Sequence, residues 1–230
     1  MSIPKQQELD LAYDLDLFSP DNNRSDGRLG RGGPSFPAEL ISQEIESESI
    51  RFKIGSTVDE QNNAISCRGQ EIELPKGEYN KLYILATASN DVKDSILIGD
   101  KYCPLNVQGA FGFVGQFYNR RLTEDQRTVT KVITPFTRRD NIAWFASHRH
   151  IAYPSKNDAY QYCYIYKYEV NIPKGVQKVT LPNNNKIIVF SMTVAESSND
   201  EGKALQPLYD YFDGAKDLEL RQDKTPVPTL

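Results

Sequence analysis

The sequence has few of the residue types that usually carry metal and redox chemistry. Its 230 residues include two histidines, three cysteines, two methionines and one tryptophan. Cys67, Cys103 and Cys163 are too scattered for a disulfide framework, and none belongs to a Cys-x-x-Cys pair. The Gly-x-Ser-x-Gly motif of serine hydrolases is also absent. These gaps argue against a disulfide scaffold and against a serine hydrolase of the Gly-x-Ser-x-Gly type.

Long apolar runs and excess positive charge are missing as well. No stretch approaches the roughly 20 apolar residues that a membrane-spanning helix requires. Residues 1–30 are polar and contain no secretory signal peptide. The formal net charge is −4, so no basic field attracts nucleic acid. We therefore expect neither a membrane span nor a nucleic-acid partner.

Tyrosine, in contrast, is abundant, and five tyrosines occupy alternate positions from Tyr160 to Tyr168. A period of two is the β-strand period, so this row shares one face of a sheet. The same face continues through Val170 and Ile172, which predicts a buried inner wall with its wet end near Tyr160. The alternative is an exposed platform on which sugar rings stack. The opposite face is predicted to meet solvent through three polar residues, Gln161, Lys167 and Glu169.

Many short strand candidates are separated by Gly, Pro and Asn turns, with almost no helical pattern. This predicts an all-β, antiparallel, jelly-roll-like β-sandwich with little helix. The strongest candidate is the nearly continuous apolar run at residues 81–88. We expect one domain over residues 1–216, with a Gly-rich loop inside residues 1–60, and a mobile tail over residues 217–230. Residues 9–18 are predicted as a strand and residues 201–212 as the one helical segment.

Two similar corners recur in the chain. Leu74-Pro75-Lys76-Gly77 precedes the apolar run, and Ile172-Pro173-Lys174-Gly175 follows the tyrosine row. Each combines a strand end, a proline with fixed φ and a glycine turn. They are consistent with two equivalent positions in a jelly roll.

Two segments contain potential metal ligands. His148 and His150 share one face of a predicted strand, but no third histidine exists, and we predict no metal site there. Asp21, Asn23 and Asp26 loosely resemble an oxygen-rich loop for a structural calcium ion, although the spacing does not fit an EF-hand. The alternative for this loop is an Asx-rich turn.

Several motifs together resemble a known domain. In chain order, the segments are similar to the C-terminal β-domain of bacterial α-mannosidase-like proteins of glycoside hydrolase family 38. They are residues 63–70, 74–86, 112–120, 143–150, 157–160 and 206–210. The resemblance implies an accessory β-sandwich that is not itself an enzyme, because the family's catalytic machinery lies in a separate upstream domain. It also implies a periplasmic or extracellular setting and two partners, a carbohydrate and the catalytic domain.

On this interpretation, polar groups at strand ends face the sugar or the neighbouring domain. The candidates are Gln116, Asn119, Arg120, Trp144, His148, Arg149 and His150. Amide and guanidinium groups beside one aromatic ring suit sugar hydroxyls and a C–H face. Three alternatives stay open: a free-standing carbohydrate-binding or lectin-like module, a structural interaction domain without a sugar site, and a compact hydrolase with two adjacent acids over a cleft.

Overall fold

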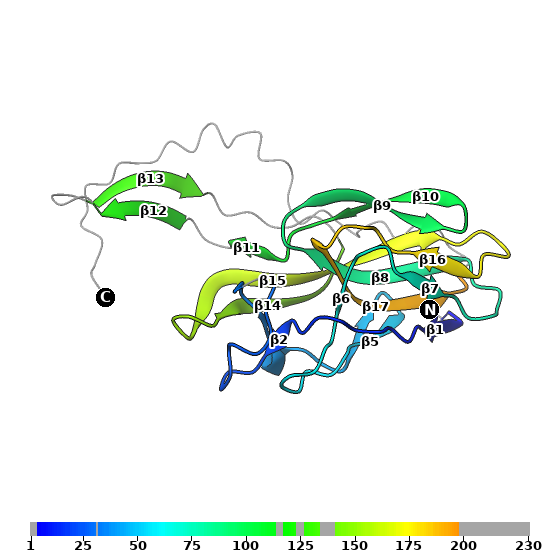
Figure 1. Ribbon diagram of the computed structural model, residues 1–230, viewed down its shortest axis with the longest axis horizontal. Helices are drawn as coiled ribbons and strands as arrows, with labels where there is room; N and C mark the ends of the chain where they lie inside the picture. The colour runs from blue at the N-terminus through cyan, green and yellow to red at the C-terminus, as the bar shows by residue number, and fades with distance from the viewer. Residues whose placement is uncertain (1–3, 31, 114–116, 123–126, 134–140, 198–230) are drawn as a thin grey trace.

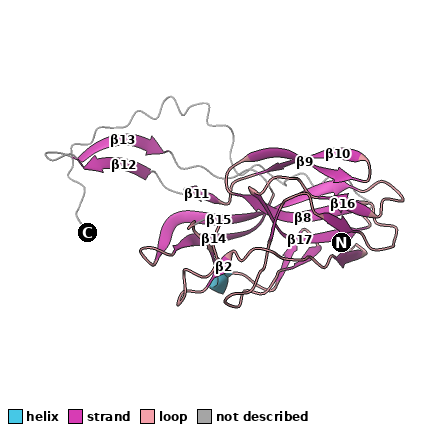
Figure 2. Cartoon of the chain, in the orientation of Figure 1, coloured by secondary structure: helices cyan, strands magenta, loops and turns pink. Residues whose placement is uncertain are grey.

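The computed structural model describes residues 4–30, 32–113, 117–122, 127–133 and 141–197. Strands dominate this part of the chain, and its single helical element is the short 3-10 helix η1 (Ala38–Leu40) (Figure 2). No helix among the described residues is long and apolar enough to cross a membrane. The prediction of an all-β, antiparallel fold with little helix is confirmed.

A seven-stranded antiparallel sheet forms the centre of the molecule (Figure 1). Its path runs β1-β17-β8-β15-β11, while β14 pairs with β15 and β6 pairs with β17. The strands are β1 (Gln6–Glu8), β6 (Ile65–Ser66), β8 (Lys81–Ala88), β11 (Phe111–Phe113), β14 (Ile142–Ile151), β15 (Lys156–Asn171) and β17 (Ile187–Ala195).

A second, four-stranded sheet packs on one face of the central sheet. Its order is β10-β9-β16-β7, with β7 at Glu71–Glu73, β9 at Val92–Ile98, β10 at Lys101–Val107 and β16 at Lys178–Thr180. The first core lies between the two sheets, where Leu82 and Ile84 of β8 pack in one cluster with Ile96 of β9. These two layers are the β-sandwich that the sequence predicts.

The N-terminal region covers the other face of the central sheet as a third layer. It contains β2 (Phe18–Ser19), β3 (Phe36–Pro37), η1, β4 (Glu44–Ser47) and β5 (Ile50–Lys53). The second core lies beneath it, and there Phe36 stacks on Phe190 of β17, with ring centroids 5.6 Å apart. This double coverage explains why every residue of β8 is buried: alternate side chains enter opposite cores.

The tyrosine row lies on the sandwich side of β15. Tyr164 and Tyr166 are buried, and Tyr162 and Tyr168 are partly buried. The Tyr166 hydroxyl donates a hydrogen bond to the carbonyl of Gly109 at 3.1 Å, as buried tyrosines require. The prediction of an inner wall is confirmed for Tyr164, Tyr166 and Tyr168, and Tyr162 lies at the partly exposed end of the row. The Tyr160 side chain lies outside the described part.

The prediction for the opposite face of this strand was wrong at two of three positions. Glu169 is exposed, but Gln161 and Lys167 are buried. At Lys167 the N-terminal layer is the cause, because it places the Ser47 carbonyl and the Glu48 carboxylate on the ammonium group.

Residues 9–17 also differ from the prediction, since they form no strand. The Leu9 amide donates to the Met192 carbonyl of β17 at 2.8 Å, and Leu15 forms an isolated bridge with Ala64, just before β6. Two further strands, β12 (Phe117–Leu122) and β13 (Arg127–Ile133), pair antiparallel as a separate hairpin. The expected helix at 201–212 and tail at 217–230 lie outside the described residues.

Candidate functional site

Three of the predicted contact residues precede β14 in the chain. Gln116 lies outside the described residues. Asn119 and Arg120 belong to β12, where the register with β13 shifts between them. Their side chains are not among those described, so their proposed contacts stay predictions.

Trp144 is partly buried, and its ring is committed to contacts within the domain. The ring packs against Phe18 and Phe36, with centroids 6.4 and 5.9 Å away, and Nε1 donates to the carbonyl of Leu40 at 2.9 Å. The third layer therefore uses Trp144 to seal the second core.

Arg149 is also committed to contacts within the domain. Its guanidinium forms an ion pair with Asp158 on the neighbouring strand, with Nη2 2.8 Å from Oδ2, and lies over the Phe111 ring at 5.2 Å. His148 is partly exposed, and its Nδ1 lies 3.3 Å from the Ser147 hydroxyl. Of the segment 144–150, only part of the predicted polar surface is free for a ligand.

Phe145 of the same segment forms an aromatic pair with Tyr162, and neither residue is among the contact residues predicted from the sequence. Phe145 of β14 is 59% exposed and stacks on Tyr162 of β15, with centroids 6.2 Å apart and planes at 11°. Tyr162 in turn contacts Tyr164 at 6.4 Å, which continues the row into the core. The signal was available, because alternation puts Phe145 on the face opposite Trp144.

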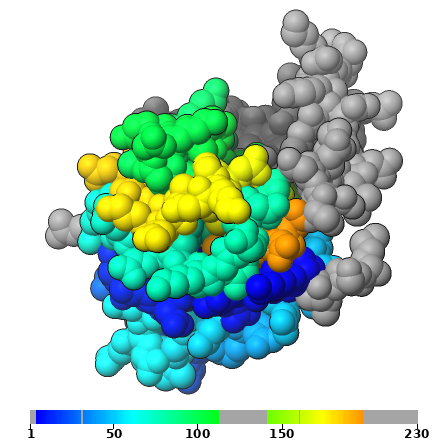
Figure 3. Space-filling view, turned by 90° about the vertical axis from the view of Figure 1, so that its right-hand side faces the viewer, coloured from blue at the N-terminus to red at the C-terminus, as the bar shows by residue number. Residues whose placement is uncertain are grey.

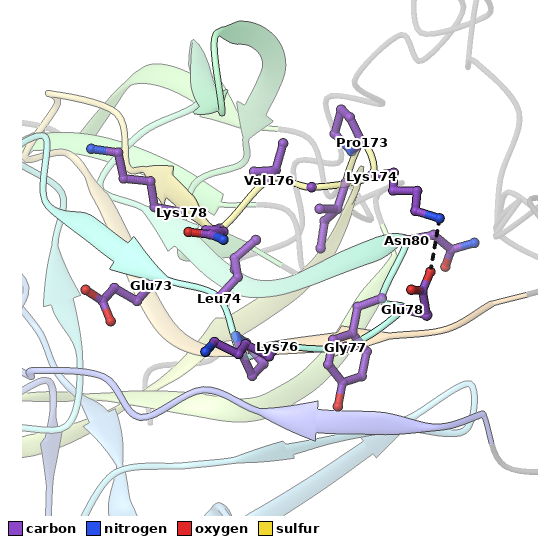
Figure 4. Close-up of a pocket in the computed structure, with 15 residues that line it drawn as sticks. Glu73, Leu74, Lys76, Gly77, Glu78, Asn80, Pro173, Lys174, Val176 and Lys178 are labelled. Atoms are coloured by element: carbon purple, nitrogen blue, oxygen red, sulfur yellow. Dashed lines mark ion pairs between the residues drawn. The ribbon is translucent and has the colours of Figure 1, made fainter.

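A hollow of about 580 Å³ lies at one end of the sandwich, between the two Pro-Lys-Gly corners (Figure 4). Figure 3 looks onto this end, where the yellow corner at 173–178 lies beside the teal corner at 73–80. The two similar corners are thus neighbours on one rim.

The hollow combines an apolar floor with a charged rim. Leu74, Val176 and the buried Ile172 line it, while Lys174 and Glu78 form an ion pair at 4.0 Å across its mouth. The Tyr79 ring is packed against Gly77, where a Cβ atom would lie 2.5 Å from the ring, and its hydroxyl donates to Gln7 at 3.1 Å. The hollow has the size of a small-molecule site, but its one aromatic ring is held by the scaffold.

A third group of side chains converges on His150. Its ring is fully buried, and Nδ1 lies 3.0 Å from the Ser19 hydroxyl, which itself contacts Ser35. Nε2 lies 3.3 Å from Asp21 Oδ1, and Glu39 completes a set whose ligand atoms all lie within 4.8 Å of one another.

The environment of this group sets the charge of its members. Burial lowers the pKa of His150, against the opposing effects of Glu39 and Asp21, and so favours the neutral ring. Desolvation alone raises the pKa of Asp21, but the hydrogen bond from Asn157 and the charge of Arg24 outweigh it and lower the pKa. Arg24 Nη2 lies 2.6 Å from Asp21 Oδ1.

The oxygen-rich loop does not gather its side chains around one point. Asn23 donates to Asp59 at 3.1 Å, and Asp26 accepts from the Glu60 amide at 2.9 Å. Asp21 faces His150 instead. This arrangement matches the Asx-rich turn rather than a calcium loop over Asp21, Asn23 and Asp26.

Besides Asp21 and Glu39, a second pair of neighbouring carboxyl groups is formed by Asp16 and Asp26. Burial is the main cause that raises the pKa of Asp16 to about 6, and the charge of Asp26 adds to it. The hydrogen bond from Asn63 acts in the opposite direction. Asp16 Oδ2 is buried without a hydrogen-bond partner. Neither residue lines the hollow, so the pair is not placed on a substrate cleft.

The layered arrangement defines the class of protein as an antiparallel β-sandwich domain. Residues 5–198 match the family model of the AziU2-like beta-sandwich domain, and the chain belongs to this family. No curated protein matches the chain. Neither finding links it to glycoside hydrolase family 38, so only the β-sandwich part of that resemblance is supported.

Proposed function

We propose that this chain is a non-catalytic carbohydrate-binding β-sandwich domain whose ligand stacks on Phe145 and Tyr162. The observation that carries the proposal is the nearly parallel pair of the exposed Phe145 ring and the partly buried Tyr162 ring, with planes at 11°. Planar apolar faces of this kind suit the C–H face of a sugar ring, and ligand sites combine such surfaces with a few polar groups.

The sheet holds this platform in a fixed orientation. Tyr162, Tyr164, Tyr166 and Tyr168 contact one another in series at 6.0 to 6.4 Å. The Tyr166 hydroxyl donates to the Gly109 carbonyl at 3.1 Å, and the Tyr168 hydroxyl accepts from the Gln108 amide at 2.9 Å. A ligand therefore meets a preorganised surface, and little side-chain entropy is lost on binding.

Non-catalytic action is supported by the placement of the acidic groups. Glycoside hydrolysis uses two carboxyl groups on either side of the scissile bond. The Asp16–Asp26 pair faces Asn63 and the Glu60 amide instead of the hollow or the aromatic platform. The accessory role beside a catalytic domain and the extracytoplasmic setting stay predictions from the resemblance.

Glycan-array binding and titration of the recognised oligosaccharide test the proposal. We expect Phe145→Ala to weaken binding at least about tenfold, which corresponds to about 1.4 kcal/mol. Tyr102→Ala is the matched control, because Tyr102 is 70% exposed on the other sheet. Equal loss in both variants, or no glycan bound by the wild-type chain, would contradict the proposal.

The hollow gives the experiment a second arm. Lys174→Ala removes one rim charge and breaks the ion pair with Glu78, 4.0 Å away. If this variant loses glycan binding while Phe145→Ala keeps it, the ligand sits between the two corners and the platform assignment is wrong. Hydrolysis of aryl glycosides by the pure chain would refute the non-catalytic assignment.

A further inference from the structure

The cluster at His150 draws its members from three separate segments. Asp21 follows β2, Glu39 lies in η1 and His150 lies near the end of β14. Reciprocal backbone hydrogen bonds between Ser35 and His150, at 3.0 and 3.1 Å, fix the N-terminal layer against β14 at this point. The fold therefore holds the histidine in place beneath the two carboxylates.

The buried imidazole has one nitrogen satisfied and one not. Nδ1 contacts the Ser19 hydroxyl at 3.0 Å, whereas Nε2 is buried without a hydrogen-bond partner among the described atoms. Leaving a buried polar atom unpaired is unfavourable, so such atoms often mark a site for an ion or a water molecule. This nitrogen points towards the Asp21 and Glu39 carboxylates.

We propose that His150 Nε2, Asp21 and Glu39 form a binding site for a divalent transition-metal ion of the zinc class. A tetrahedral zinc ion with bonds of about 2.0 to 2.1 Å has ligand atoms about 3.3 to 3.4 Å apart. The distance from His150 Nε2 to Asp21 Oδ1 is 3.3 Å.

The chemistry of the donor set selects the ion. A neutral imidazole with two carboxylates suits zinc, whereas calcium and magnesium prefer oxygen ligands alone. The two carboxylates also balance the charge of a divalent cation. The Ser19 hydroxyl on Nδ1 supplies the outer contact that ordinarily orients a metal-binding histidine and fixes its tautomer.

Arg24 lies beside the proposed site and contacts one of its ligands. Its guanidinium lies 2.6 Å from Asp21 Oδ1 and donates through Nε to Asn157 at 2.6 Å. Arg24 is thus a competing cation on the same oxygen that faces His150. Metal binding requires it to move away, which makes Arg24 a sensitive probe of the proposal.

Calorimetric titration of the metal-free full chain with zinc tests the site independently of carbohydrate binding. We expect saturable binding of one ion, with an increase in the thermal unfolding midpoint. Asp21→Asn and Glu39→Gln each replace an exposed ligand and should fold normally; each is expected to weaken zinc binding at least about tenfold. Glu44→Gln, an exposed acid on β4, is the matched control and should bind as the wild type does.

Two further variants separate this ligand set from others. Arg24→Gln is expected to tighten zinc binding, because it removes the competing cation from Asp21; unchanged or weaker affinity would overturn the assignment of that oxygen. His148→Ala should retain binding, since His148 is not in the cluster although its ring centroid lies 5.4 Å from that of His150. Absence of zinc binding, or its loss in His148→Ala, would refute the proposal.

Discussion

The buried ion pair between Lys167 and Glu48 should respond very differently to the loss of each partner. The Lys167 side chain is 4% exposed, whereas that of Glu48 is 38% exposed. The Lys167 ammonium contacts the Glu48 carboxylate, the Ser47 carbonyl at 3.2 Å and the Tyr83 ring at 5.8 Å. Of these three groups, Glu48→Ala removes the carboxylate and leaves the buried ammonium with the Ser47 carbonyl as its polar contact.

The expected magnitudes follow from these exposures. Removing one partner of a buried pair typically destabilises by about 3 to 5 kcal/mol, and we expect about 3 kcal/mol for Glu48→Ala because water reaches that side of the pair. Lys167→Met replaces the buried charge with an apolar chain and leaves the carboxylate on the wet side. We expect it to stay within about 1 kcal/mol of the wild type.

Urea unfolding at neutral pH measures both changes through the midpoint and slope. Glu71→Ala is the control, because its pair with Lys178 is more than half exposed on both sides and should be worth less than about 1 kcal/mol. Equal destabilisation by Glu48→Ala and Lys167→Met, or a larger effect of Lys167→Met, would refute the reasoning.

The pH dependence provides a second check on the same pair. Burial raises the pKa of Glu48, but the hydrogen bonds from Lys167 and Asn141 outweigh it and lower the pKa. The stabilisation is therefore present at neutral pH and is lost as pH falls through the lowered pKa. The difference between wild type and Glu48→Ala should shrink in acid.

Three other expectations concern stability and reactivity. The pKa of Asp16 is raised to about 6, chiefly by burial, so the stability of the wild type should fall as pH rises from about 4 to 6. Asp16→Asn should lack this fall in urea titrations across that range, and a pH-independent difference from the wild type would contradict the assignment. Phe190→Ala removes a fully buried ring from the second core. It should lower the free energy of unfolding by about 3 to 5 kcal/mol, measured by chemical denaturation. A decrease below about 1 kcal/mol would mean that the third layer does not pack there. Thiol titration of the native chain should modify Cys103 first, because Cys67 and Cys163 are buried. Burial raises the pKa of Cys67 to about 12 and raises that of Cys163 above its ordinary range. Early modification of either buried thiol would be inconsistent with the two cores.

The strand pattern of this fold is readable from the sequence where alternation is strong. The tyrosine row predicts β15 and its buried face, and the apolar run predicts β8 as a central strand. Alternation cannot show whether another layer covers the second face of β15. Gln161 and Lys167 on that face are polar, which is typical of solvent-facing residues, yet both are buried. The burial of Lys167 depends on the N-terminal layer, which lies far away in sequence.

The candidate sites show the same limit. His150 and Asp21 carry no shared motif, and tertiary contacts such as the bridge between Ser35 and His150 bring their segments together. Trp144 was assigned to a ligand surface because its chemistry suits sugars, but its partners Phe18 and Phe36 lie in segments whose position the sequence does not reveal. Phe145, one residue later, was readable from parity.

The position of β8 has a consequence during synthesis. This strand lies between β15 and β17, both of which leave the ribosome long after it. Its apolar residues 82–86 therefore have no sheet partners while the intervening chain is synthesised. During this time both edges of the strand can pair with other nascent chains. The protein's vulnerability to aggregation should be greatest before β17 emerges, and premature termination upstream of residue 187 should yield an insoluble product.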